Sequence, residues 1–151
     1  GETSYYINEA HKKGHPILGI CLGMQIMFER SEEDFSIDGL NFLPGHVVNL
    51  YKNKKKFNPP SNIGYSRLYS SRTKNLGQFR KFDGKNFYFL HSFGIVDDQL
   101  LTDQKLYINF NDKEVLAMFH HQNLVGIQFH PERSGKIGVE LLSTIVKLFA
   151  K

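Results

Sequence analysis

Cysteine is nearly absent from this sequence, and so are long hydrophobic runs. Cys21 is the only cysteine in 151 residues, which excludes a disulfide within the chain and is typical of a reducing compartment. The longest apolar stretch, residues 16–28, contains Gln25 and is shorter than the ~18 residues that a membrane span needs. No signal peptide pattern is visible either. We therefore expect a cytoplasmic protein with no membrane partner.

Strong charge is also missing. The formal net charge is +4, and the one dense basic run covers residues 52–56, just before Pro59 and Pro60. A solvated loop is the favoured interpretation of that run, and contact with a partner or an anionic substrate is the alternative. No nucleic-acid motif and no second basic cluster accompany it, so we expect no nucleic-acid partner. No glycine-rich phosphate-binding motif is present, and we expect no cofactor.

What the sequence does contain is the pattern of a nucleophile elbow around its single thiol. The pattern is Gly19-Ile20-Cys21-Leu22-Gly23, a G-x-S-x-G turn with cysteine in place of serine. Residues 16–20 form a short apolar run that predicts a buried parallel strand, and residues 22–30 predict a helix. Small residues at positions 19 and 23 suit the close approach of strand and helix backbones.

An elbow of this kind predicts a reactive thiol. At a helix N-terminus, backbone N–H groups favour the thiolate of Cys21, and the N–H of Leu22 is placed to stabilise an oxyanion. The alternative is that Cys21 is a buried core cysteine, the commonest state of a lone thiol.

A candidate base follows far downstream, in His130-Pro131-Glu132. Residues 114–120 and 124–129 predict two strands joined by a hairpin around residues 122–123, and His130 falls where the second strand ends. Sites in open α/β sheets lie outside the carboxyl ends of the strands, so His130 is expected to reach Cys21. Glu132 is expected to hold the imidazole in the tautomer whose free nitrogen faces the thiol.

The remaining histidines are interpreted as surface or hydrogen-bonded structural groups: His11, His15, His46, His91, His120 and His121. A metal site built from His120, His121 and His130 is an alternative without typical ligand spacing, so we expect no metal site.

The other elements are predicted from periodicity and β-propensity. A helix ends near Lys13 and Gly14, strands cover residues 47–51, 86–92 and 105–110, and a helix runs from an N-cap at Ser134 to about Phe149. The core-facing stripe of that last helix is expected to be Leu141, Leu142, Ile145, Val146 and Phe149. The fold class is therefore α/β, an open, mostly parallel sheet flanked by helices with additional antiparallel strands.

Several segments, in one order along nearly the whole chain, resemble the class I (triad) glutamine amidotransferases. Within that family the glutaminase subunits of imidazole glycerol phosphate synthase are the most similar subgroup. The segments are residues 19–25 with Ser31-Glu32-Glu33, Gly39-Leu40 with Leu43-Pro44-Gly45, residues 89–93 and residues 126–134.

The resemblance implies a Cys21–His130–Glu132 triad that hydrolyses glutamine through a thioester. It further implies that Gln25 and Glu33 help to bind glutamine, and that Ser92 and Phe93 offer it backbone contacts. Gln25 as a solvent-facing helix residue and Glu33 as a loop carboxylate are the alternatives. Only 19 residues follow Glu132 (151 − 132 = 19), so we expect the ammonia to pass to a separate synthase or cyclase subunit in a heterodimer.

Two departures from the family pattern keep other functions open. Residues 61–66 (Ser-Asn-Ile-Gly-Tyr-Ser) replace the family's Pro-His-(Met/Ile)-Gly-Trp-Asn, so a paralogue that supplies ammonia to a surface-sugar-modifying synthetase is an alternative to the usual cyclase partner. The family's first strands and its Pro-Gly-rich oxyanion loop are missing. Residues 1–151 are therefore expected to be one N-terminally incomplete glutaminase domain, a stand-alone cysteine hydrolase of the same fold, or a truncated non-catalytic interaction module.

Overall fold

The computed structural model of the protein describes residues 1–51, 62–70 and 75–151. The basic run at 52–56 and the Pro59-Pro60 pair lie outside the described residues. The elements in chain order are α1 (Glu2–Lys12), β1 (Ile17–Ile20), α2 (Leu22–Gln25), β2 (Arg30–Ser31), β3 (His46–Asn49), β4 (Asn62–Arg67), η1 (Gly77–Phe82), β5 (Asn86–His91), β6 (Phe93–Ile95), β7 (Lys105–Phe110), β8 (Lys113–His121), β9 (Leu124–Ile127), η2 (Pro131–Arg133) and α3 (Gly135–Phe149).

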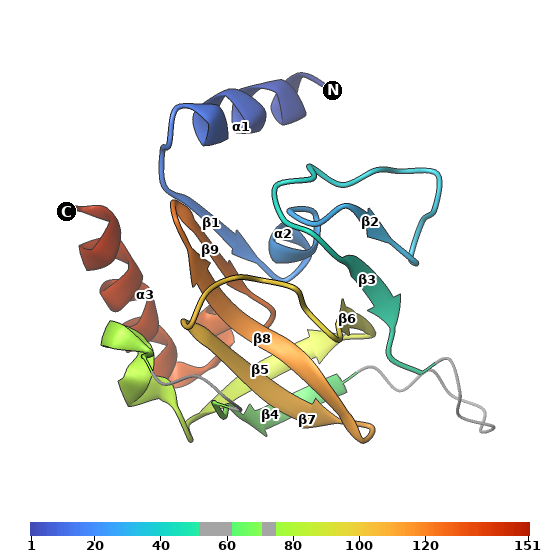
Figure 1. The fold of residues 1–151 in the computed structure, drawn as a ribbon. Helices are drawn as coiled ribbons and strands as arrows, with labels where there is room; N and C mark the ends of the chain where they lie inside the picture. Colours follow the sequence, from blue (N-terminus) through green and yellow to red (C-terminus); the bar gives the residue numbers. More distant parts are fainter. Residues whose placement is uncertain (52–61, 71–74) are drawn as a thin grey trace.

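A four-stranded sheet in the order β1-β9-β8-β7 occupies the centre of the molecule (Figure 1). β1 and β9 are parallel, with Ile20 opposite Ile127, whereas β9, β8 and β7 are antiparallel neighbours. The parallel pair places the residues that follow β1 and β9 at the same edge of the sheet. The site described below lies at that edge.

Two smaller sheets complete the fold. β2, β3 and β6 form one, with a parallel and an antiparallel pair, and the antiparallel strands β4 and β5 form the other. The expected α/β class with additional antiparallel strands is confirmed. Within the described residues, however, antiparallel pairs outnumber parallel ones, and the short connections of β7–β8–β9 allow only antiparallel pairing.

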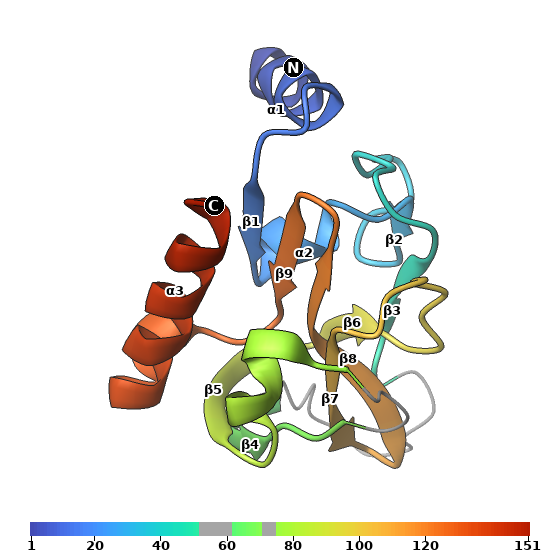
Figure 2. The same cartoon turned by 60° about the vertical axis from the view of Figure 1, so that its left-hand side comes forward.

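The central sheet separates two hydrophobic cores. On one face, α3 and η1 pack against the sheet (Figure 2), and Leu141 and Ile145 of α3 are buried there. On the other face, α2 and β3 cover it, and Met24 and Val47 are buried with Phe119 of β8. Alternate residues of a strand point to opposite faces, so the nearly continuous apolar run of β8 and β9 supplies both cores.

Most of the predicted elements are confirmed to within a few residues: β1, β3, β5, β7, the β8–β9 hairpin, the first helix and the last one. The helix expected over residues 22–30 is wrong in length, because α2 ends at Gln25 and turns lead directly into β2 at Arg30. The predicted stripe of α3 is wrong at Val146, which is 67% exposed. No helix among the described residues is both long and apolar enough to cross a membrane.

Candidate active site

The backbone turns sharply at Cys21, between β1 and α2. Its φ of 53° and ψ of −111° are unusual for a residue with a side chain and are typical of strained positions at functional sites. The Cys21 N–H donates to the carbonyl of Ile127 (2.6 Å), and its carbonyl accepts from the N–H groups of Met24 and Gln25. These bonds fix the turn that the elbow pattern predicts.

The two elbow glycines are not equivalent. A Cβ at Gly19 would lie 2.5 Å from the carbonyl oxygen of Gly23, whereas a Cβ at Gly23 would meet nothing within 4 Å. Gly19 is therefore required by the close approach of β1 and α2. The expectation that Gly23 is needed for the same reason is wrong.

The parallel register of β1 and β9 brings Gln128 beside Cys21. The Gln128 Nε2 lies 3.7 Å from the Cys21 Sγ, a normal length for an amide that donates to sulfur. Cys21 is partly buried, and the carbonyl of Leu90 lies 3.9 Å from its sulfur. The thiol is thus held between Gln128, which follows β9, and Leu90 of β5.

Burial raises the pKa of the Cys21 thiol, and the negative charges of Glu132 and Glu33 raise it further. The hydrogen bonds from the Leu22 N–H and from Gln128 lower the pKa. The expected thiolate-stabilising effect of the elbow is therefore present at Leu22, but it does not outweigh burial. A helix of only four residues also contributes little dipole.

His130 and Glu132 form the expected pair. The His130 Nδ1 lies 2.7 Å from a carboxylate oxygen of Glu132, and since a carboxylate only accepts, Nδ1 carries the proton. The N–H of His130 donates to the carbonyl of Tyr88, which anchors it beside β5. Within the described residues no hydrogen bond joins His130 to Cys21 directly; the Cys21 sulfur contacts Gln128 and Leu90 instead.

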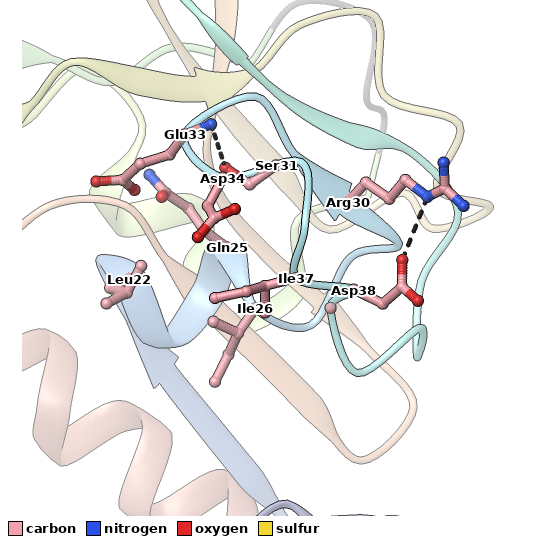
Figure 3. A pocket seen from close by; sticks show the side chains of 10 residues that line it. Leu22, Gln25, Ile26, Arg30, Ser31, Glu33, Asp34, Ile37 and Asp38 are labelled. Atoms are coloured by element: carbon pink, nitrogen blue, oxygen red, sulfur yellow. Dashed lines mark hydrogen bonds and ion pairs between the residues drawn. The ribbon is translucent and has the colours of Figure 1, made fainter.

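A pocket of about 240 Å³ opens at the sulfur. It is lined by Cys21, Leu22, Gln25, Glu33, Leu90, His91, Ser92 and Phe93, which include every residue that the resemblance assigns to glutamine binding. A second hollow of about 480 Å³ adjoins it through Leu22, Gln25 and Glu33. Figure 3 shows these three side chains at one end of that hollow, with the Arg30–Asp38 ion pair at the other.

Gln25 is buried and does not face solvent, so the alternative of a solvent-facing helix residue is wrong. Its Nε2 donates to the carbonyl of Phe93 and to the Oε1 of Gln128, both at 3.0 Å. The amide protons of Gln25 are therefore committed to the protein, and its Oε1 is the atom that could meet a ligand.

Hydrogen bonds to the carbonyl groups of Ser92 and Phe93 hold this segment of the pocket in place. The Phe93 carbonyl accepts from Gln25 and from the His91 Nδ1 (2.7 Å), which occupies both of its lone pairs. The Ser92 carbonyl accepts from the Leu50 N–H. Any backbone contact that Phe93 makes to a substrate therefore comes from its N–H.

Three residues of the hydrogen-bond network around the site were not predicted from the sequence: Gln128, His91 and Asn62. Burial lowers the pKa of His91, which keeps it neutral, and the Asn62 Nδ2 lies 3.2 Å from its Nε2. Gln128 could have been found as the one polar residue in the predicted apolar strand, residues 124–129.

His120 bonds to Gln104 and to the Gln122 carbonyl through both ring nitrogens, so it is a structural residue. In the described part of the chain, no cluster of three potential metal ligands is found.

The family model "Glutamine amidotransferase class-I" matches residues 1–147. This chain therefore belongs to the class I glutamine amidotransferase family. The chain is 40% identical over 140 residues to an imidazole glycerol phosphate synthase subunit HisH of Prochlorococcus marinus, covering 90% of this chain and 61% of that protein. The HisH subunit of a Geobacillus species is 36% identical over 146 residues, covering 95% and 67%.

Solved structures agree on the fold. A crystal structure of a glutamine amidotransferase covers 98% of this chain and 68% of its own, with a TM-score of 0.59 and 13% identity. Another, from Thermotoga maritima, covers 97% and 53%, with a TM-score of 0.53 and 20% identity. The chain thus spans about three fifths to two thirds of the length of the curated relatives described above.

Proposed function

We propose that this chain is a glutaminase in which Cys21 is the nucleophile, His130 the general acid and base, and Glu132 the residue that orients His130. The observation that carries the proposal is the strained Cys21 at the carboxyl end of β1, at the sheet edge where the His130–Glu132 pair also lies. Strain of this kind costs about 1–3 kcal/mol and persists where it serves a function.

The reaction follows from these roles. The Cys21 thiolate attacks the side-chain amide carbon of glutamine, and the resulting oxyanion is stabilised by the Leu22 N–H. The C–N bond breaks as His130 gives its proton to the departing ammonia, which leaves a thioester on the sulfur. Water then loses a proton to His130 and attacks the thioester, the C–S bond breaks to release glutamate, and His130 returns the proton to the Cys21 sulfur, which restores the thiol.

Electrostatics explain why His130 must take part. The thiol of Cys21 has a raised pKa because it is partly buried and near two carboxylates, so the thiolate is scarce unless a nearby base takes its proton. Glu132 keeps the Nδ1 of His130 protonated, which leaves Nε2 as the basic nitrogen. Small shifts of a triad upon substrate binding commonly close a contact that is open in the free enzyme.

The pocket suits the rest of the substrate. Glu33 supplies a negative charge at its rim that complements the α-ammonium group of glutamine, and the Oε1 of Gln25 adds an acceptor. The N–H groups of Ser92 and Phe93 are the backbone donors proposed for the substrate carboxylate.

We further propose a heterodimer in which the ammonia passes to a separate synthase or cyclase subunit in histidine biosynthesis. The support is that the relatives similar over 90% or more of this chain are named subunits of imidazole glycerol phosphate synthase. Residues 1–151 are proposed to act as one glutaminase domain.

Glutamate release from glutamine, measured with and without a purified cyclase subunit, tests the function. Cys21→Ala should abolish turnover, because no other thiol is present, whereas Ser143→Ala on the exposed face of α3 should leave it unchanged. Stimulation by the cyclase supports the heterodimer. A rate of glutamate release that is the same with and without the cyclase would instead indicate a stand-alone hydrolase. No glutamate release in any mixture would indicate a non-catalytic module.

A further inference from the structure

A chain of buried polar side chains runs through the interior and ends on the catalytic sulfur. Among the described residues six polar side chains are buried, and four of them (Asn62, His91, Gln25 and Gln128) belong to this chain. The other two lie outside it: Ser134 bonds to the His130 carbonyl and the Tyr88 N–H, and Thr144 bonds within α3. Burying a polar group costs free energy unless it is hydrogen-bonded. A buried series of hydrogen-bonded side chains is therefore expected to have a structural or functional role.

The direction of every hydrogen bond in the chain is fixed by one carbonyl. The Phe93 carbonyl oxygen can only accept, so the group of Gln25 that faces it is the amide nitrogen. The same nitrogen faces Gln128, so Gln128 must turn its oxygen toward Gln25. The remaining half of the Gln128 amide, its NH₂ group, is thereby aimed at the sulfur of Cys21, 3.7 Å away.

We propose that Gln128 is a positioning residue that holds the Cys21 thiolate by donating a hydrogen bond to its sulfur, in an orientation that the Phe93 carbonyl imposes through Gln25. The inference rests on the proposed role of Cys21 as the nucleophile. It connects the pocket loop to the reacting atom, because the Phe93 carbonyl lies beneath that loop.

Two features make Gln128 suited to this role. Its side chain is fully buried, so water does not compete for its NH₂ group. Its bond to the sulfur opposes the effect of burial on the thiol pKa, as does that of the Leu22 N–H. Without Gln128, the Leu22 N–H would be left to oppose burial and the charges of Glu132 and Glu33.

The alkylation rate of Cys21 by iodoacetamide, followed from pH 6 to 10, tests the proposal on the full chain. Cys21 is the only cysteine, so the reaction has no background from other thiols and requires neither glutamine nor a partner. Gln128→Met keeps the length of the side chain and removes the donor. We expect its profile to move to higher pH, with a rate near neutral pH lower by about tenfold, since bonds to charged groups are the stronger ones.

Two more variants sharpen the test. Gln25→Met removes the donor that orients Gln128 without touching the sulfur, and should shift the profile in the same direction by a smaller amount. Thr144→Val, a buried polar residue outside the chain of bonds, should leave the profile in place.

Folding is checked by circular dichroism, and Gln25→Met carries the test if Gln128→Met does not fold. Folded variants at both positions with the wild-type profile would overturn the proposal. A shifted profile in a chain that releases no glutamate would uphold the role of Gln128 and refute only the glutaminase function, so the two failures are distinguishable.

Discussion

The two halves of the candidate site are built in different ways. The half that carries Cys21 is held by a strained backbone and by two buried side chains, Gln25 of α2 and Gln128, which follows β9. In the half that carries His130, hydrogen bonds to Tyr88 and Ser134 hold the backbone, whereas the imidazole is oriented by an ion pair with Glu132, whose side chain is 55% exposed. The position of the sulfur is therefore a property of the whole core, whereas the imidazole is oriented locally.

This contrast fits the demands of the proposed reaction. A nucleophile has to stay at one place relative to the oxyanion donor, which rigid packing provides. A proton carrier has to serve first the sulfur, then the leaving ammonia and then water, so a less confined imidazole suits it. Each of the following experiments changes a residue in or beside one of the two halves.

The largest effect is expected on the base side, from Glu132→Gln. An amide in place of the carboxylate no longer fixes the imidazole tautomer, and kcat for glutamine hydrolysis should fall by about 10²- to 10⁴-fold. Because the charge of Glu132 raises the pKa of Cys21, the same variant should be alkylated faster than wild type at neutral pH. Activity and thiol reactivity thus move in opposite directions.

Glu140→Gln is the matched control for that experiment. Glu140 forms an exposed ion pair with Lys81, where removing one charge has little effect. A kcat for Glu132→Gln within a few-fold of wild type would show that Glu132 does not orient His130.

On the nucleophile side, Gly19→Ala should unfold or weaken the elbow. The added methyl group would lie 2.5 Å from the Gly23 carbonyl oxygen, and overpacking of this kind costs about 1–3 kcal/mol in the free energy of unfolding. Gly23→Ala meets no atom within 4 Å and should change stability by less than about 1 kcal/mol. Urea denaturation of both variants measures the difference, and equal stabilities would contradict the tight contact of β1 with α2.

The smallest effect is expected on the pH dependence of stability, from a substitution at His91, which belongs to the buried hydrogen-bond network. Burial lowers its pKa from the ordinary value of 6.5, so the unfolded state takes up the proton first as the pH falls. The stability that the neutral imidazole contributes is present above pH 6.5 and is lost as the pH falls through the folded pKa. His91→Gln should therefore lose less stability than wild type between pH 7.5 and pH 5.

Urea denaturation at the two pH values measures that loss. The exposed His46 gives the control variant, His46→Gln. His120, whose pKa burial also lowers, contributes to the wild-type slope and is left in place. An unchanged slope in His91→Gln would indicate that His91 is not held neutral by its surroundings.

Local patterns predicted most of the fold. The β-branched and aromatic runs became strands, the hairpin formed where Gln122 and Asn123 interrupt two of them, and the elbow pattern marked the strained turn at Cys21. The predictions that were wrong concern how far an element extends and which way it faces. α2 stops after four residues because the chain turns there into β2, and Val146 is exposed because the sheet contacts a different face of α3.

The sequence by itself determined which residues are candidates for the nucleophile and the base, since each motif consists of neighbours in the chain, residues 19–23 around the thiol and residues 130–132 around the imidazole. Only the tertiary structure decided that Gln128 faces the sulfur and that Gln25 faces inward. Their partners lie 68 to 107 residues away, and the contacts of Gln128 depend on the register of β1 against β9. Local propensity carries no information about a register between distant strands, because that register is set by the packing of the whole sheet.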